Sequence, residues 1–416
     1  MDKIKIVGQN ILSGEIVVSG SKNSVVSLIP AAILSDKVSI KNIPQISDVR
    51  DLEDILKYLN VSFKYDGDVL HIDSTDLVNK EINTSFSKKL RASYYFMGSL
   101  LGRFRRVSIS LPGGCEIGAR KFDFHLKAFE KMGARISVKD DLFIIEAVRL
   151  NGAVIDLPFP SVGATVNILL ASVLASGETV INNAACEPEI GNLIDFLISM
   201  GAKINGKGTN CLRIVGVSEL RGGVIEVIPD RIEAGTYILM GIMNGDNLRI
   251  SNVNPDHLTS FFEILDKMGA DYKIDGDSII TNRTSTLNPV KIETAVYPGF
   301  PTDLQQPITS LLVMANGQSV VKETIYENRF QNTIYLNSMG ADITRKDDSI
   351  YINGPSFLKG KLVKTSDLRA GAALILAALS ASGETTITDI KHLLRGYSDL
   401  VNKLSNVGAK IWLEDE

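Results

Sequence analysis

Cysteine, histidine and tryptophan are scarce in this chain of 416 residues, which contains three, four and one of them. Cys115, Cys186 and Cys211 lie too far apart in so long a chain to form a disulfide framework. The four histidines are scattered without the spacing of metal ligands, so the sequence predicts no metal site. These shortages favour a protein of the reducing cytoplasm.

Long hydrophobic runs are also missing. The most apolar tracts, 168–175 and 372–381, are shorter than the roughly 20 residues that span a bilayer. The opening MDKIKIVGQN lacks the apolar core of a signal peptide. The formal net charge of −4 argues against a general nucleic-acid binder, which needs a basic surface. We therefore expect a cytoplasmic protein without membrane insertion, with two domains because of its length.

The sequence contains one unit written six times. The phrases MGARI, MGAKI, MGADY, MGADI and VGAKI place glycines at 133, 201, 269, 340 and 408, and a degenerate sixth copy, LNVSF, lies at 59–63. The spacings are 68, 68, 71 and 68 residues. A fixed period of this kind indicates a repeat architecture.

Each unit reads as a helix followed by strands. Apolar residues before the glycines recur with helical spacing, as in the stripe Ile190, Leu193, Ile194, Leu197 and Ile198. Each glycine then stands where a helix ends in a left-handed residue, and phrases such as ASGET predict a turn into a further strand. The two ASGET copies are 206 residues apart, about three units, so we expect two α/β domains of three units each, with a boundary near residue 229.

Cys115 lies in the stretch LPGGCEIGAR, between glycines and five residues before Arg120. We expect Cys186 and Cys211 to be structural cysteines buried in apolar surroundings. Cys115 has two open interpretations, a structural residue or a reactive thiol, because nearby cations favour the thiolate and a thiol can serve as a general acid.

Basic residues precede or begin several apolar helices: Lys22 with Asn23, Arg91, and Arg369. They are either cations that reach solvent at helix ends or parts of an anion site, since helix N-termini attract anions. Asp303, and Glu327 with Arg329, also stand just ahead of apolar segments. Capping of the helix explains the acidic residues as well as a catalytic base does.

Ten segments in order resemble the UDP-N-acetylglucosamine 1-carboxyvinyltransferases, which are enolpyruvyl transferases. The segments are SGSKN (19–23), LRAS (90–93), LPGGCEIGAR (111–120), SVGATVN (161–167), NAACEPEI (183–190), PDRIEAGT (229–236), FPTDLQQP (300–307), ENRF (327–330), SDLRAGAALILA (366–377) and RGY (395–397). The resemblance extends over nearly the whole chain.

The resemblance implies an inside-out α/β barrel of two similar domains, each with three βαβ-type units. It places the first domain at 22–229 and a discontinuous second domain at 1–21 and 230–416. The implied reaction transfers the enolpyruvyl group of phosphoenolpyruvate to the 3-hydroxyl of UDP-N-acetylglucosamine and releases phosphate, in the first committed step of peptidoglycan synthesis. It proceeds by addition and elimination without a metal or other cofactor.

The resemblance also implies roles for residues. Cys115 would protonate the methylene carbon and Asp303 would accept the proton of the sugar hydroxyl. The phosphate would be held by Lys22, Arg120 and Arg395, and the carboxylate by Arg329 and Arg369. The remaining substrate contacts would come from Asn23, Arg91, Lys121, Phe122, Asp123, Phe124, Ser161, Val162, Gly163 and Ile325.

Two features separate this chain from relatives of the same fold. Some members carry a lysine just before the SVGA segment, where this chain has Phe159 and Pro160. Members with aspartate in place of the loop cysteine exist, so Cys115 predicts sensitivity to the thiol-alkylating epoxide fosfomycin. The rival interpretations are a transferase acting on shikimate 3-phosphate, which uses no cysteine acid, and an inactive protein that binds a sugar nucleotide.

Overall fold

The computed structural model describes residues 3–89, 91–110, 122–140 and 142–414. These residues form two compact units. The C-terminal unit holds the described residues up to Ser19 together with those from Pro229 onward, and the N-terminal unit holds the described residues of 20–110 and 122–228. The domain limits 1–21, 22–229 and 230–416 stay a prediction, because compactness alone does not test independent folding.

The described part of the C-terminal unit contains three four-stranded sheets. In spatial order they are β21 (Leu362–Lys364), β22 (Glu384–Thr388), β1 (Lys3–Val7) and β23 (Lys410–Glu414); β15 (Tyr272–Asp275), β16 (Ser278–Thr281), β14 (Gly245–Ser251) and β2 (Leu12–Val17); and β17 (Lys291–Glu293), β18 (Gly317–Lys322), β20 (Ser349–Gly354) and β19 (Asp342–Lys346).

The N-terminal unit repeats this arrangement over its described residues. Its sheets are β11 (Lys203–Asn205), β12 (Cys211–Val215), β10 (Glu178–Asn182) and β9 (Val154–Asp156); β13 (Val224–Glu226), β3 (Lys37–Lys41), β5 (Val69–Asp73) and β4 (Ser62–Asp66); and β6 (Arg106–Ser110), β8 (Leu142–Glu146) and β7 (Arg135–Lys139).

All six sheets follow one plan. A central strand pairs in parallel with a short edge strand and antiparallel with a hairpin, as β10 pairs with β9 and with β12. In the sheet of β6, the bridge between Ile82 and Ile109 takes the place of the edge strand. In the sheet of β22, the antiparallel pair of β23 and β1, from opposite ends of the chain, takes the place of the hairpin, with Lys3 opposite Glu414. The strand β1, near the N-terminus, therefore completes a sheet whose other strands lie some 360 residues later in the chain, from Leu362 onward.

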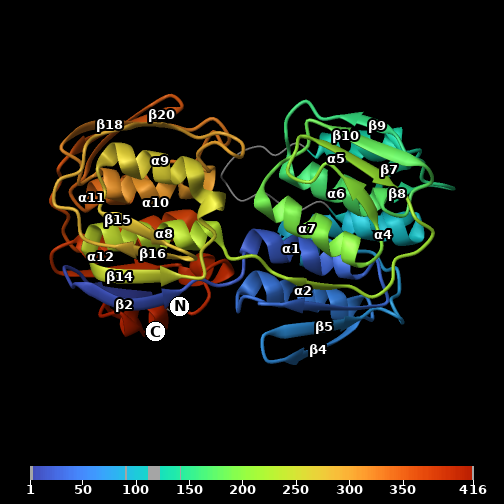
Figure 1. The fold of residues 1–416 in the computed structure, drawn as a ribbon, viewed down its shortest axis with the longest axis horizontal. Helices are drawn as coiled ribbons and strands as arrows, with labels where there is room; N and C mark the ends of the chain where they lie inside the picture. Colours follow the sequence, from blue (N-terminus) through green and yellow to red (C-terminus); the bar gives the residue numbers. More distant parts are fainter. Residues whose placement is uncertain (1–2, 90, 111–121, 141, 415–416) are drawn as a thin grey trace. The chain divides into compact units, whose positions relative to one another are not determined.

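Each repeat contributes one inner helix. These helices are α1 (Lys22–Ala32), α4 (Phe96–Phe104) and α6 (Val162–Ser172) in the N-terminal unit, and α8 (Arg231–Asn244), α10 (Thr302–Leu312) and α12 (Leu368–Ser380) in the C-terminal unit. In the C-terminal unit the three inner helices pack against one another, and α8 is buried at all 14 positions. Figure 1 shows α9 and α10 between the sheet of β18 and β20 and the sheet of β14 and β2. Helices thus lie inside and sheets outside.

The second helix of each repeat is amphipathic or short. These helices are α2 (Ser47–Tyr58), α5 (Asp123–Lys131), α7 (Pro188–Ser199), α9 (Thr259–Met268), α11 (Asn332–Ser338) and α13 (Leu400–Asn406). The remaining short elements are α3 (Thr84–Ser87) and the 3-10 helices Arg91–Tyr95, Pro255–Leu258 and Ile390–Arg395.

The glycines of the repeated phrase lie just beyond these second helices and have left-handed φ values. The angles are 94° at Gly133, 102° at Gly201, 70° at Gly269, 113° at Gly340 and 100° at Gly408. In the degenerate copy Asn60 takes this conformation, with φ 64°. Asparagine and glycine tolerate it better than residues with a branched Cβ. The predicted helix ends are confirmed.

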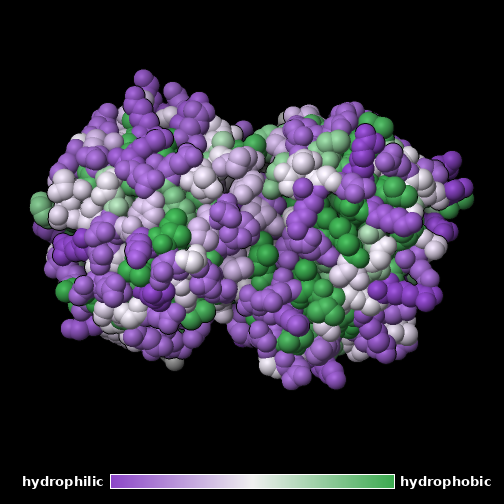
Figure 2. Space-filling view, in the orientation of Figure 1, coloured by the Kyte–Doolittle hydropathy of each residue, from purple (hydrophilic) through white to green (hydrophobic). Residues whose placement is uncertain are grey.

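The predicted apolar stripe on α7 is wrong at one position. Four of its members are buried, but Ile198 is 44% exposed, although Leu197 before it and Met200 after it are buried, because Ile198 lies at the edge of the buried face of the helix. On the face in Figure 2, hydrophilic residues cover most of the surface, as the buried apolar core requires. Among the described helices, none is long and apolar enough to cross a membrane.

Candidate active site

The start of α10, like that of α4, has no side-chain cap. The other four inner helices have a side-chain oxygen that accepts a hydrogen bond from a backbone N–H of the first turn, at Ser21, Ser161, Asp230 and Asp367. The N-cap of α10 is Pro301, which makes no such bond. The polar residues that follow, Thr302 and Asp303, bond to side chains from other elements. The capping role considered for Asp303 is therefore wrong.

Asp303 bridges two buried arginines. Its Oδ1 accepts a hydrogen bond from Arg329 Nη2 at 2.7 Å, and its Oδ2 accepts one from Arg369 Nη2 at 3.0 Å. The side chains of Arg329 and Arg369 are 4% and 3% exposed, whereas that of Asp303 is 24% exposed. Three segments 26 and 66 residues apart thus meet in a cluster with one accessible carboxylate and an excess of positive charge.

The charges in this cluster support one another. Burial alone would raise the pKa of the Asp303 carboxyl group, but the charges of Arg369 and Arg329 outweigh it and hold this pKa well below its usual range. Burial likewise opposes the charge of Arg369, and the Asp303 carboxylate overcomes it and raises the pKa of that guanidinium. Asp303 is therefore ionised, and while both arginines hold it, it is a weak base.

Further hydrogen bonds fix each arginine from behind. Arg329 Nη1 donates to Thr302 Oγ1 at 2.9 Å, and the Thr302 hydroxyl donates to Glu323 Oε2 at 2.8 Å. Arg369 Nη1 donates to the hydroxyl of Tyr397 at 3.3 Å, and Arg369 Cζ lies over the Tyr397 ring, 5.7 Å from its centroid. Both guanidinium groups are therefore held in defined positions before any ligand arrives.

Arg329 lies in the segment between β18 and α11. The predicted capping of α11 by Glu327 with Arg329 is also wrong. The N-cap of α11 is Gln331, without a side-chain hydrogen bond, and Glu327 is exposed. Ile325, a predicted contact of the sugar nucleotide, is half-buried, and its N–H donates to Glu323 Oε1 at 2.8 Å. Thus Glu323 binds the segment that carries Ile325 and Arg329.

In the N-terminal unit, Lys22 begins α1 and Asn23 follows it. Lys22 Nζ lies 3.1 Å from Asp48 Oδ2, with 14% of the lysine side chain and 1% of the aspartate side chain exposed. The lysine therefore does not simply extend into solvent. Its buried partner on α2 holds the ammonium group at the start of α1.

Two predicted substrate-binding segments meet through an aromatic cluster. Phe122, just before α5, packs edge-on against Tyr94, with ring centroids 5.6 Å apart, and Tyr94 packs in the same way against His125 at 5.3 Å. A Cβ on Gly163 would lie 2.5 Å from the Tyr94 hydroxyl oxygen and 3.2 Å from His125 Cε1. The absence of a side chain at Gly163 thus lets the first turn of α6 approach the segment that starts α5.

Other predicted residues occupy separate positions. Ser161 caps α6 and Val162 begins it, Asp123 begins α5 and is exposed, and Phe124 is half-buried. Arg91 begins a 3-10 helix, and Arg395 ends another and is half-buried. Phe159, which with Pro160 stands where some relatives carry a lysine, is 40% exposed. Cys115, Arg120 and Lys121 lie outside the described residues.

The expected burial of the other two cysteines is wrong. Cys186, between β10 and α7, and Cys211, at the start of β12, are both half-buried, and their thiols lie beside polar groups: Cys186 Sγ is 3.6 Å from the Ala184 carbonyl oxygen, and Cys211 Sγ is 3.5 Å from Asn182 Oδ1. Partial burial raises the pKa of the Cys186 thiol, with a further contribution from Glu187, so this cysteine is not activated as a nucleophile.

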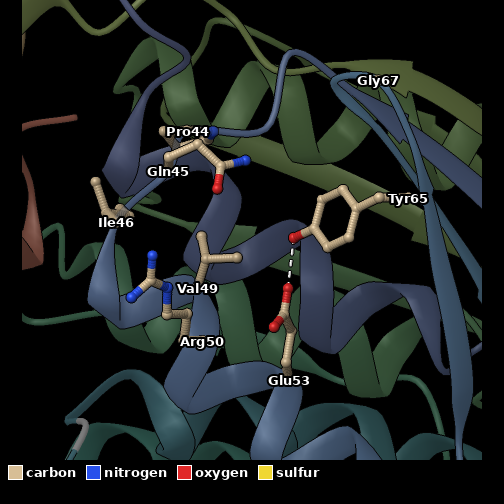
Figure 3. Close-up of a pocket in the computed structure, with 8 residues that line it drawn as sticks. All are labelled: Pro44, Gln45, Ile46, Val49, Arg50, Glu53, Tyr65 and Gly67. Carbon is tan, nitrogen blue, oxygen red and sulfur yellow. Dashed lines mark hydrogen bonds between the residues drawn. The ribbon is translucent and has the colours of Figure 1, made fainter. Parts of the chain in front are cut away.

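A surface pocket of about 410 Å³ on the N-terminal unit contains none of the predicted site residues. Figure 3 shows the Tyr65 hydroxyl pointing at the Glu53 carboxylate, to which it donates a hydrogen bond, while Arg50 lies on the next turn of α2. Burial, together with Glu53, raises the pKa of Tyr65. The tyrosine stays neutral, and the pocket offers no activated group.

Comparison with known proteins gives a consistent result. Residues 6–404 match the family EPSP synthase (3-phosphoshikimate 1-carboxyvinyltransferase). The chain is 49% identical over 415 residues to UDP-N-acetylglucosamine 1-carboxyvinyltransferase 2 of Geobacillus kaustophilus, and 48% identical over 416 residues to the protein of that name from Bacillus subtilis; each match covers 100% of this chain and 97% of the relative.

The chain belongs to the EPSP synthase family. It is also similar to the crystal structure of the enolpyruvyl transferase NikO from Streptomyces tendae, with a TM-score of 0.91 and 28% identity over 99% of both chains. The inside-out α/β fold of two similar units, each with three repeats, is thereby confirmed. The family resemblance found in the sequence is confirmed as well.

Several residues at the site were not predicted from the sequence. Tyr397 and Thr302 lie inside the segments RGY and FPTDLQQP that carry the family resemblance, so these segments contain a signal for both residues. His125 follows Phe124 directly in the chain. Asp48 and Glu323 lie in segments without a motif, and only the fold reveals their contacts.

Proposed function

We propose that this protein transfers the enolpyruvyl group of phosphoenolpyruvate to the 3-hydroxyl of UDP-N-acetylglucosamine and releases phosphate, a step of peptidoglycan precursor synthesis. The observation that carries the proposal is the Asp303 carboxylate held between Arg329 and Arg369, within a chain 49% identical to a protein of that name. Two buried cations beside an accessible carboxylate suit a reaction of an anionic substrate that requires a base.

The reaction requires proton transfer at carbon and stabilisation of charge. In the addition step, a proton goes to the methylene carbon of phosphoenolpyruvate and the sugar oxygen attacks the neighbouring carbon. In the elimination step, the methyl carbon loses a proton and phosphate leaves. We assign the proton donor to Cys115, the phosphate contacts to Lys22, Arg120 and Arg395, and the carboxylate contacts to Arg329 with Arg369. Fixed cations stabilise the charge without reorganisation as the reaction proceeds.

Asp303 can act as the base only after its own partners change. A carboxylate with a depressed pKa accepts a proton poorly, and both arginines depress the pKa of Asp303. The carboxylate of phosphoenolpyruvate is an alternative partner for the same guanidinium groups. A bound substrate that takes one of these hydrogen bonds raises the pKa of Asp303 toward the value a base needs.

We assign the nucleotide side of the substrate to the N-terminal unit. The N–H groups of the first turn of α6, which begins at Val162, are suited to a diphosphate because a helix N-terminus attracts anions. The packing of Gly163 on Tyr94 and His125 keeps this turn beside Phe122. Asn23, Arg91, Lys121, Asp123, Phe124, Ser161 and Ile325 complete the proposed substrate contacts.

A phosphate-release assay tests the proposal directly. The purified full chain is incubated with phosphoenolpyruvate and either UDP-N-acetylglucosamine or shikimate 3-phosphate. We expect phosphate only with the sugar nucleotide. As a matched control, C115S should lose turnover while it keeps its affinity for the nucleotide. Phosphate release with shikimate 3-phosphate would assign the chain to the sister reaction, and nucleotide binding without release by the wild-type chain would leave only a binding protein.

A further inference from the structure

Glu323 is a buried carboxylate that joins several parts of the C-terminal unit. It is 4% exposed and lies directly after β18. Its Oε1 accepts hydrogen bonds from Thr294 Oγ1 at 2.8 Å and from the N–H groups of Ile325 at 2.8 Å and Tyr326 at 3.1 Å. Its Oε2 accepts the hydroxyl of Thr302 at 2.8 Å. Four donors from three segments thus meet on one side chain.

The internal repeats show that this position usually has a different structure. After the central strands β3, β10 and β14 stand Asn42, Asn183 and Asn252, with φ of 58°, 57° and 57°. Each asparagine donates its side-chain amide to a carbonyl of the neighbouring chain segment, at 2.8, 2.9 and 2.8 Å. In these repeats the asparagine amide ties the end of the central strand to the residue after the edge strand, and this hydrogen bond does not involve an inner-helix side chain.

The repeat of β18 lacks this asparagine. The Glu323 N–H donates to the Asp348 carbonyl at 2.8 Å and continues the pairing of Lys322 with Ser349, so no additional residue stands between β18 and Glu323. The equivalent residue after the edge strand is Thr294, whose hydroxyl donates to Glu323, whereas Val18, Leu157 and Val227 stand there in three other repeats. The repeat of β22 has Thr365 at this place and Asp389 after its central strand, but the Thr365 hydroxyl donates to the Asp389 carbonyl and the Asp389 carboxylate pairs with Lys364. In the repeat that carries Asp303, the carboxylate instead reaches the inner helix α10 through Thr302.

We infer that Glu323 is a positioning residue that holds Arg329 through Thr302 and, with its other oxygen, the backbone of Ile325 and Tyr326. The hydroxyl proton of Thr302 points to the carboxylate, so its lone pairs accept from Arg329 Nη1. This order of donors fixes the Arg329 guanidinium beside Asp303. The inference rests on the proposed function, in which Arg329 binds the carboxylate of phosphoenolpyruvate and Ile325 contacts the sugar nucleotide.

Two variants separate the contact of Glu323 with Thr302 from its contacts with the backbone of Ile325 and Tyr326. T302V removes the hydroxyl between Glu323 and Arg329 and leaves the Ile325 and Tyr326 contacts in place. We expect it to raise KM for phosphoenolpyruvate about tenfold, the effect of losing one hydrogen bond to a charged group, with KM for UDP-N-acetylglucosamine unchanged. T302S keeps the hydroxyl and should restore the wild-type value. E323Q presents an amide donor to Thr302 and should raise both KM values.

T309V is the matched control for T302V, because Thr309 is also buried on α10 and its hydroxyl also makes a hydrogen bond, to the Gln305 carbonyl at 2.8 Å. A merely structural role predicts that both variants lower thermal stability and leave both KM values alone. Equal KM values for T302V and T309V, or failure of T302S to restore, would overturn the inference. If the wild-type chain shows no turnover, the proposed function fails separately, and calorimetric affinities of these variants for phosphoenolpyruvate then decide about Glu323.

Discussion

Replacing Asp303 with asparagine removes the negative charge between Arg329 and Arg369 while it keeps nearly the same volume. The asparagine retains one acceptor oxygen but presents its NH₂ group to the other guanidinium. Removal of one partner from a buried ion pair costs about 3–5 kcal/mol. Since the Asp303 side chain is 24% exposed, solvent compensates part of this loss, and we expect about 2–3 kcal/mol.

Thermal unfolding of D303N measures this loss. For a unit of about 200 residues, each kcal/mol lowers Tm by about 2–4 °C, so we expect a decrease of roughly 5–10 °C at pH 7. D275N is the matched control, because Asp275 also pairs with an arginine of the same unit, Arg249, at 2.9 Å, but both side chains are 39% or more exposed. That variant should change stability by less than about 1 kcal/mol.

The contribution of Asp303 to stability should depend on pH in a defined direction. The folded-state pKa of Asp303 lies well below the unfolded value of about 4. Its contribution to the free energy of unfolding is therefore fully present above pH 4 to 5 and is lost as the pH falls toward the folded pKa. The Tm difference between wild type and D303N should be constant from pH 5 to 7 and should shrink below pH 4. Equal Tm values at pH 7, or a difference that grows on acidification, would refute the arrangement of charges described here.

Two further predictions concern the N-terminal unit and the cysteine loop. G163A places a Cβ 2.5 Å from the Tyr94 hydroxyl oxygen, so the first turn of α6 must shift; we expect KM for UDP-N-acetylglucosamine to rise about tenfold with KM for phosphoenolpyruvate unchanged, and steady-state kinetics showing the reverse would contradict the assignment. Preincubation with fosfomycin should inactivate the wild-type chain and spare C115S, because the epoxide alkylates the thiolate; inactivation of both proteins would move the reactive group elsewhere.

The repeat architecture could be predicted from sequence because each copy carries its own signals. A left-handed residue follows the second helix of every unit, and in five of them it is a glycine, so five glycines appear at nearly constant spacing and reveal the period. The ASGET-like phrase also recurs from unit to unit, so the strand after each copy was predictable as well. The exposure of Ile198 was not, because helical periodicity marks an apolar stripe but does not show how far around the helix the packing partners reach.

The candidate site was predictable only as a set of residue types. Without the resemblance, local sequence favoured capping for Asp303, since an aspartate before an apolar helix commonly caps it. The pairing of Asp303 with Arg329 and Arg369 joins residues 26 and 66 positions apart, and no local pattern reports such distances. Glu323 gave no signal at all, because its role depends on contacts with Thr302 and with Thr294, which lies 29 positions before it.

The internal repeats separate structure from function within a single chain. Features shared by several repeats, such as the side-chain caps of α1, α6, α8 and α12, are explained by folding alone. The repeat of α10 lacks such a cap, as that of α4 does, and it carries Thr294 and Glu323 where the repeats of β3, β10 and β14 carry an apolar residue and an asparagine. The repeat of β22 also has a threonine and an acidic residue at these two places, but there the Thr365 hydroxyl donates to the Asp389 carbonyl and the Asp389 carboxylate pairs with Lys364. Glu323 instead reaches α10 through Thr302, which accepts a hydrogen bond from Arg329. Since the residue types at these places recur in another repeat, the feature that points to selection for the chemistry at Asp303 is the path of hydrogen bonds from Glu323 to Arg329.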